Sequence, residues 1–335
     1  MKKRGRKKGA FGEGHGPDAT PSSIRPLYFL GICVLSFVSI IGLPDSVFVP
    51  LNHVVASLSG LCIGLFGRPS VVAGDIITLN GFRVQIITEC TGVYCMVLFG
   101  AFVVSVPSSL KSRLTGLLLG VSFLGTVNIL RIAFVTMVGA GYPGLFEGVH
   151  VYLGQVVMLL LTVAVSLAWK RWATRSASGS GMFLLRATAL ASIIFPLWLV
   201  VNRAYVRGLD HLVAGLFSLA DYRLVFPYRH MAYYQTFNVV LLVALILAER
   251  RIHSYRKVIW TVGGVAILAA GHLLFRIGNV MLTAFEWQPA LPLTKGLTVF
   301  GEYLVPILIW LAVAQYSLEK GPSVIKQTRS IMGRF

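Results

Sequence analysis

The chain alternates long apolar runs with short polar segments that contain most of its basic residues. An α-helix needs about 20 apolar residues to cross a bilayer. The runs predict eight such helices, near residues 27–43, 93–106, 114–138, 150–169, 183–201, 234–248, 258–282 and 297–318. Residues 51–66 form a further amphipathic stretch that is short for a crossing, which is typical of an interfacial or re-entrant helix.

One polar segment between these runs has the pattern of a β-hairpin. Residues 75–87 contain two β-rich runs on either side of Asn80-Gly81, and both turn residues tolerate a positive φ angle. The second run leads directly to Cys90, where an apolar helix begins. We therefore expect an all-α polytopic membrane protein with about eight transmembrane helices and a small extracytoplasmic β-hairpin.

Composition agrees with a membrane protein. The 335 residues are 56% hydrophobic and 13% charged, whereas soluble domains have about 25% charged residues. Mean hydropathy is +0.77. The formal charge of +18 could suggest nucleic acid, but the basic residues fall between apolar runs and act better as topology signals. We expect no nucleic-acid partner, a multi-pass location in the cytoplasmic membrane, and both termini in the cytoplasm.

The first apolar run could be a signal peptide because basic residues precede it. Pro44-Asp45-Ser46, however, offers no small-residue cleavage site, so an uncleaved first helix fits better. The expected segments are a disordered basic cytoplasmic tail (1–26), a four-helix unit (27–172), a cytoplasmic linker (173–182), a second four-helix unit (183–319) and a basic cytoplasmic tail (320–335).

Two pairs of segments indicate an internal repeat. Residues 51–58 resemble residues 209–216, and each pair member follows an outward helix; residues 129–132 resemble residues 274–277. Four helices per half would make the copies parallel. The second copy has no cysteine and no counterpart of the hairpin or of His150. Duplication with chemistry kept in the first half is one interpretation, and chance similarity of apolar segments is the other.

Three candidate catalytic residues lie at one predicted membrane level. A thiol at a helix start is favoured as the thiolate by the positive end of the helix dipole, which makes Cys90 a candidate nucleophile. Arg131 lies about 25 Å from the inner end of its helix, near the outer interface. His150 opens the next helix at the same interface. Together they provide a nucleophile, a fixed cation for an oxyanion and a proton carrier, as acyl transfer requires.

Simpler roles are possible for each of these residues. Arg131 could pair with a helix end or with Glu89, and His150 could be an interfacial histidine. Glu89 and Asn128 are supporting candidates that could orient the site. A transporter or membrane binding protein built from parallel repeats, with Arg131 and Arg276 as anion contacts, is the alternative function. Four cysteines without paired spacing predict no disulfide framework, no metal site and no cofactor.

Three motifs carry a family resemblance. Glu89-Cys90-Thr91-Gly92, the segment of residues 128–132 and the segment of residues 150–154 resemble, in the same order, the motifs of the exosortase and archaeosortase family. That family consists of membrane cysteine transpeptidases. The resemblance covers about residues 27–172 and implies that Cys90 is the nucleophile, Arg131 the oxyanion contact and His150 the acid-base residue.

The resemblance also implies a substrate. Its partners would be exported proteins that end in a short recognition motif, a transmembrane helix and a basic tail, together with the lipid bilayer and an unknown acceptor nucleophile. A substrate helix anchored in the same membrane would hold its motif at the outer interface beside Cys90. The second half departs from the family pattern, and a degenerate member serving as a scaffold or sensor is a third hypothesis.

Overall fold

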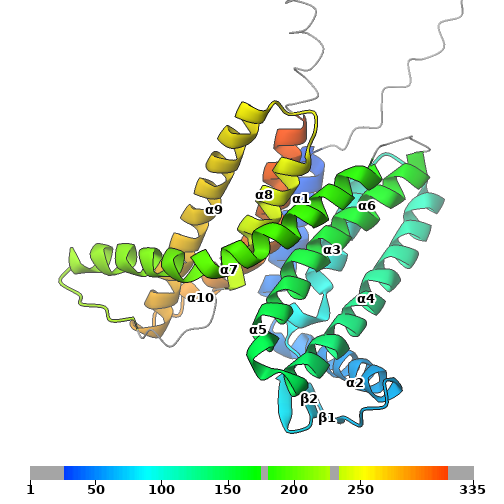
Figure 1. The fold of residues 1–335 in the computed structure, drawn as a ribbon, viewed down its shortest axis with the longest axis horizontal. Coiled ribbons are helices and arrows are strands. Elements are labelled where there is room, and N and C mark those ends of the chain that lie inside the picture. Colours follow the sequence, from blue (N-terminus) through cyan, green and yellow to red (C-terminus); the bar gives the residue numbers. More distant parts are fainter. Residues whose placement is uncertain (1–25, 175–179, 227–233, 316–335) are drawn as a thin grey trace, which may run out of the picture.

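A computed structural model describes residues 26–174, 180–226 and 234–315, and helices dominate them. The predicted tails, residues 1–26 and 320–335, lie outside the described residues except for Pro26. The centre of the predicted linker at residues 173–182 also lies outside them. The described helices form two groups, with one long helix running across both (Figure 1).

The first group contains the predicted hairpin and all the candidate site residues. Its helices are α1 (Pro26–Gly42), α2 (Val49–Leu65), α3 (Val93–Ser105), α4 (Leu110–Gly141), α5 (Pro143–Val151) and α6 (Met158–Thr174). Short turns connect them: the 3₁₀ segments η1 (Asp45–Val47) and η2 (Thr88–Thr91), and the π-helical segment η3 (Tyr152–Val157). The strands are β1 (Val71–Ala73), β2 (Ile76–Leu79) and β3 (Phe82–Gln85).

The second group follows the long helix α7 (Ser180–Ser218). It contains the 3₁₀ segment η4 (Tyr234–Phe237), the helices α8 (Asn238–Ala248), α9 (Ser254–Thr283) and α10 (Ala290–Val299), and the π-helical segment η5 (Phe300–Leu304), which continues as a helix to Gln315. The start of α1 and the end of this last helix lie at the same end of the molecule, opposite the β-sheet (Figure 1).

The predicted hairpin is present, and a third strand joins it. Asn80 and Gly81 have φ angles of 50° and 80°, and the turn places Leu79 opposite Phe82. β1 pairs antiparallel with the far side of β2, so the strand order is β1-β2-β3. The expectation of a two-stranded hairpin was therefore incomplete, because β1 has only three residues and its pairing depends on neighbours rather than on its own pattern.

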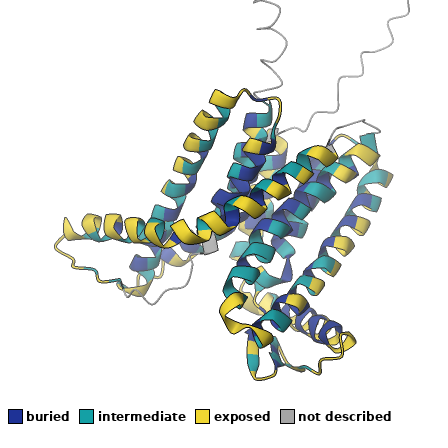
Figure 2. Cartoon of the chain, viewed as in Figure 1, coloured by how far each residue is buried: buried dark blue, intermediate teal, exposed yellow. Residues whose placement is uncertain are grey.

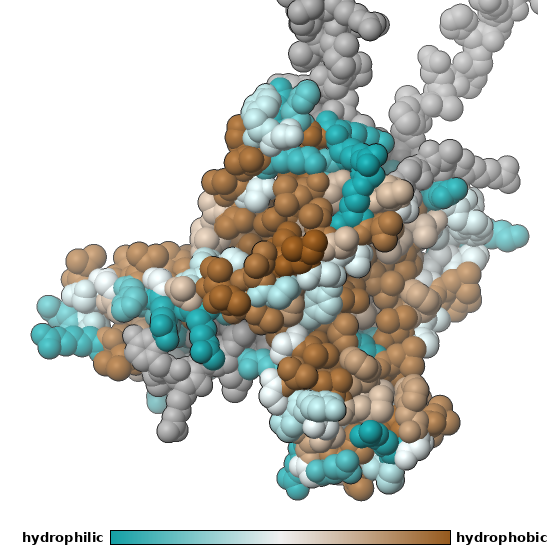
Figure 3. Space-filling model, viewed as in Figure 1, coloured by the Kyte–Doolittle hydropathy of each residue, from teal (hydrophilic) through white to brown (hydrophobic). Residues whose placement is uncertain are grey.

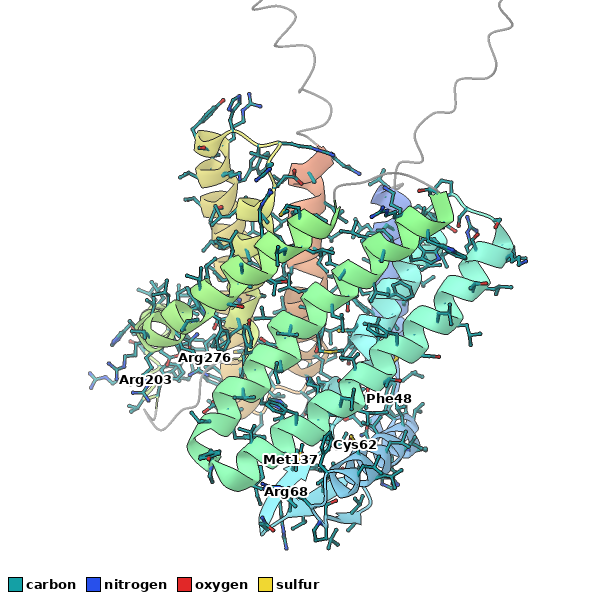
Figure 4. All side chains as sticks on the ribbon, turned by 45° about the vertical axis from the view of Figure 1, so that its right-hand side comes forward. Phe48, Cys62, Arg68, Met137, Arg203 and Arg276 are labelled. Atoms are coloured by element: carbon teal, nitrogen blue, oxygen red, sulfur yellow. The ribbon has the colours of Figure 1, made fainter. Side chains whose placement is uncertain are left out.

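One face of the sheet packs on α2 and α4. Alternation places Ile77, Leu79 and Val84 on the inner face, where they are buried in a cluster with residues of both helices. Cys62 on α2 and Met137 on α4 belong to this cluster and lie at the sheet end of the molecule (Figure 4). The sheet is thus anchored on the helices that flank the candidate site.

The helix lengths confirm several spans but not all eight. Within the described residues, five helices are long and apolar enough to cross a membrane: Leu110–Gly141, Pro143–Thr174, Gly181–Ser218, Ser254–Thr283 and Ala290–Gln315. The spans predicted near residues 27–43, 93–106 and 234–248 form helices of 17, 13 and 11 residues. These are shorter than the length that a straight crossing needs. That they also cross the membrane stays a prediction.

Two predicted breaks in the helices were wrong. The helices predicted near residues 114–138 and 150–169 imply a loop between them, but α4 runs to Gly141 and α5 begins at Pro143, so that only Tyr142 separates them. Residues 209–216 were expected to be separate from the predicted helix near residues 183–201. Instead, α7 continues through both segments without interruption. Proline at the first position of α5 favours helix initiation there, because its missing N–H would have no partner in any case.

The surface has an apolar middle between more polar ends. Hydrophobic residues cover the centre of the face seen in Figure 3, and hydrophilic ones gather near the α8–α9 connection and around the sheet. Much of this apolar surface is exposed, as on the outer sides of α7 and α9 (Figure 2). Exposed apolar faces on long helices are typical of lipid contact.

Candidate active site

Cys90 lies in a tight turn between the sheet and α3. The Cys90 N–H donates to the carbonyl of Ile87 at 2.9 Å, and the Thr91 hydroxyl donates to the carbonyl of Thr88 at 2.7 Å. Gly92 follows with a φ of 77°, in the left-handed region that favours glycine. These bonds fix the turn so that the chain leaves β3, presents Cys90 and enters α3.

Two side chains of α4 hold the backbone of Cys90. Asn128 donates from its amide nitrogen Nδ2 to the carbonyl oxygen of Cys90 at 2.8 Å, and Arg131 donates from Nη2 to the same oxygen at 3.2 Å. Asn128 is buried, with 1% of its surface exposed. A Cβ atom at Gly92 would lie 3.1 Å from Cγ of Asn128. Glycine at position 92 therefore permits both the turn and the close approach of α4.

Arg131 lies between Cys90 and the segment after His150. A Cβ atom at Gly154 would lie 2.8 Å from its Nη1, so the glycine makes room for the guanidinium. Its Nε is buried and has no hydrogen-bond partner among the described residues. Burying a donor without a hydrogen-bond partner costs free energy, unless a ligand accepts its hydrogen bond.

His150 is placed by an aromatic stack that reaches the sheet. Its ring stacks on Phe146 with centroids 5.4 Å apart, and Phe146 packs edge-on against Phe82 of β3 at 5.0 Å. The charge of Arg131 acts on both Cys90 and His150, which places the guanidinium near both groups. Cys90, Arg131 and His150 thus gather at the sheet end of the first group.

The electrostatics of Cys90 differ from the expectation of a thiolate at a helix start. Cys90 is in the 3₁₀ turn before Gly92, not in α3 itself. Burial raises the pKa of its thiol above the ordinary 9.0, while the charge of Arg131 and the hydrogen bond with Ile87 lower that pKa in part. Desolvation is the largest of these effects, so the resting group is a thiol.

The second group of helices reaches this site through η5. The ring of Tyr303 packs against Tyr94 of α3 at a centroid distance of 5.2 Å. The neighbouring Glu302 is buried, with 6% of its surface exposed, and lies within hydrogen-bonding reach of Gln155 in η3. The negative charge of Glu89 also acts on Glu302. Side chains of two π-helical segments, one from each group, therefore lie close together next to α3.

Arg276 has a different setting from Arg131. Its Nε donates to Asp210 at 2.6 Å, and its guanidinium lies 4.6 Å from the ring centre of Phe226. Arg276 is buried, with 9% of its surface exposed. The ion pair with Asp210 supports the structural interpretation of this intramembrane arginine.

Sequence reasoning missed Gln155, Glu302 and Tyr303. Glu302 had a usable signal, because a carboxyl inside an apolar run normally has a task. Gln155 and Tyr303 had none, since their positions depend on where the two π-helical segments meet. Cys33, Cys62 and Cys95 are buried and, like Cys90, free of disulfides. Among the described residues no cluster of His, Cys, Asp or Glu is arranged to hold a metal.

Comparison with known families adds one match. Residues 15–163 match the family model for transmembrane exosortases, and the matched region contains Cys90, Arg131 and His150. The matched region is therefore similar to the transmembrane exosortases. This similarity supports a membrane transpeptidase at the level of the family, and with the five long apolar helices of the described residues it indicates a multi-pass membrane protein. No curated protein and no solved structure matches the chain.

Proposed function

We propose that this protein is an exosortase-like cysteine transpeptidase that cleaves C-terminal sorting signals of exported proteins and uses Cys90 as the nucleophile. The contact that carries the proposal is the pair of bonds from Asn128 and Arg131 to the carbonyl oxygen of Cys90. They fix the nucleophile's backbone, and Nε of Arg131 stays buried without a hydrogen-bond partner in the described part of the chain. A buried cationic donor beside a thiol is suited to a developing oxyanion.

The reaction would proceed in two acyl transfers. Sγ of Cys90 attacks the scissile carbonyl as its proton passes to His150, and the resulting oxyanion is stabilised by the guanidinium of Arg131. His150 then protonates the departing amine while the C–N bond breaks and a thioester remains. An acceptor amine or water attacks the thioester, gives its proton to His150 and releases Cys90 as the thiol.

Glu89 and Asn128 take supporting roles in this proposal. Asn128 is a positioning residue because it acts through the Cys90 carbonyl. Glu89 precedes the nucleophile, and its charge acts on Cys90 and on Glu302. We assign it to the orientation of the polar groups around η2.

The proposed orientation places the site on the extracytoplasmic side of the cytoplasmic membrane. The β-sheet, which leads into the turn that contains Cys90, lies at the end opposite the start of α1 and the end of the last helix (Figure 1). Both chain ends would then be cytoplasmic. A substrate with its own transmembrane helix and basic tail would be anchored in parallel and would present its motif beside Cys90.

The second group of helices would be a degenerate copy of the first. Both contain a 3₁₀ turn, a short helix, a long helix, and then a helix interrupted by a π-helical segment, in the same order. The second has Gly301 in η5 and no cysteine, so its task would be to support the first. Its contacts through Tyr303 and Glu302 favour that role.

A cleavage assay with matched variants tests the proposal. The full chain is co-expressed with a tagged exported protein ending in a candidate motif, a transmembrane helix and a basic tail. Cys90→Ala should abolish processing, whereas Cys95→Ala, at a buried thiol in the next helix, should retain it. A transporter predicts the reverse dependence, with Arg276→Ala harmful and Cys90→Ala tolerated.

A further inference from the structure

The outer edge of β3 presents backbone groups that the sheet does not use. β2 and β3 alternate between hydrogen-bonded and non-hydrogen-bonded pairs, as antiparallel strands do. The bond from Ile86 N–H to the carbonyl of Asp75, at 2.8 Å, fixes the phase of this alternation. The backbones of Phe82, Val84 and Ile86 therefore face β2, and those of Arg83 and Gln85 face away.

This outward edge is open within the described part of the chain. β3 is the last strand in the order β1-β2-β3, and the outward N–H and C=O groups of Arg83 and Gln85 have no hydrogen bond to another described residue. The side chains of Arg83 and Gln85 are exposed, while Val84 is buried against the helices. An exposed strand edge with unpaired groups is a template for another extended segment.

The same edge leads directly to the nucleophile. Only Ile86 and Ile87 separate the end of β3 from the turn that contains Cys90. The five-residue step from Gln85 to Cys90 spans at most about 17 Å at ~3.3 Å per residue. The ring of Phe82, at the start of β3, is linked to His150 through Phe146. A peptide lying along the edge would therefore extend toward the turn that contains Cys90.

We propose that β3 binds the substrate by strand addition: the extended segment next to the scissile bond pairs its backbone with the outward groups of Arg83 and Gln85. This inference rests on the proposed function and identifies the substrate class as an extended polypeptide recognised through its main chain. Backbone pairing supplies binding and alternate side chains supply selectivity. Pairing would use every second amide of the substrate and leave the others free.

Covalent probes test the pairing without the natural substrate. Tetra-alanyl chloromethyl ketone and chloroacetone have the same reactive group, and each alkylates Cys90 by forming an S–C bond with loss of chloride and the thiol proton. Only the peptide reagent has amides to pair. Mass spectrometry of the full chain in detergent gives both rates at Cys90. We expect the peptide reagent to react about tenfold faster, since several hydrogen bonds contribute.

Two changes should remove that advantage. N-methylation of one alternate set of peptide amides should lower the rate about tenfold, and methylation of the other set should have little effect. Gln85→Pro removes the outward N–H at a position where an edge strand tolerates proline. It should lower the ratio of peptide to chloroacetone rates about tenfold and abolish the effect of methylation. Gln85→Ala keeps the N–H but loses the side-chain bond to Asp75, and it should lower the ratio far less than Gln85→Pro does.

The outcomes separate this inference from the proposed function. If Gln85→Pro retains the rate ratio, or if all methylated peptides react alike, strand addition at β3 is wrong. If Gln85→Pro also slows the alkylation of Cys90 by chloroacetone, the variant has disturbed the site itself. The inference then stands or falls with the unchanged chain, where methylation of only one alternate set of amides should slow the peptide reagent. The proposed function fails independently if His150→Ala and Arg131→Gln leave the chloroacetone rate at Cys90 unchanged.

Discussion

The side-chain amide of Asn128 donates a 2.8 Å hydrogen bond to the carbonyl oxygen of Cys90, across 38 residues of chain. Because Asn128 is buried, Asn128→Ala should leave that carbonyl short of a donor and cost about 1 to 3 kcal/mol of stability. Alkylation of Cys90 should slow. Thr126→Ala is the control, since its hydroxyl is exposed and bonds only within α4. Equal thermal unfolding of both variants would argue against the bond's importance.

Gly92 should tolerate alanine less well than Gly81. Both have positive φ angles, of 77° and 80°, so alanine strains each backbone by about 1 to 2 kcal/mol. Only at Gly92 does the added Cβ also approach Asn128, whereas nothing lies within 4 Å at Gly81. We expect Gly92→Ala to unfold at a lower temperature than Gly81→Ala and to lower Cys90 reactivity. Similar behaviour of the two variants would contradict the close packing of η2 on α4.

Gly154→Ala should harm activity more than stability. The new Cβ would lie 2.8 Å from Nη1 of Arg131, the far end of a flexible side chain that can move aside. Displacing the guanidinium would misplace the oxyanion contact, and we expect processing to fall about tenfold or more. Gly148→Ala is the matched control, because it meets nothing within 4 Å. Normal processing by Gly154→Ala would remove Arg131 from the chemistry.

The reactivity of Cys90 should depend on pH in a defined way. Burial raises the pKa of its thiol above 9.0, so the thiolate is the minor form at neutral pH. Alkylation by iodoacetamide should then rise about tenfold per unit from about pH 6 to about pH 9, without a plateau. Arg131→Gln removes a charge that lowers this pKa, so it should slow alkylation throughout the range, whereas Arg131→Lys should do so less. A plateau below about pH 8 would show a thiolate at rest instead.

Local patterns made the elements around the site predictable. Asn80-Gly81 determines its turn through the φ angles of two adjacent residues, and the predicted hairpin formed at that place. The apolar run of α4 placed Arg131 near the level of Cys90, and the two residues are in contact. In both cases the deciding information lies within one turn or one helix.

Contacts between distant segments were not predictable in the same way. β1 is a strand only because β2 lies beside it. The meeting of Tyr303 with Tyr94 requires the packing of both helical groups, and no local pattern encodes it. The burial of Cys90 likewise comes from surrounding segments, which is why the dipole argument predicted the wrong direction for its pKa.

The most direct test of the central claim is mass spectrometry of Cys90 after co-expression with a tagged candidate substrate. Rapid acid quenching is used to trap the intermediate in the unchanged chain. The account predicts a substrate-derived acyl group on Cys90 that hydroxylamine releases and that is missing in Cys90→Ala. Processing of the substrate by Cys90→Ala would contradict it.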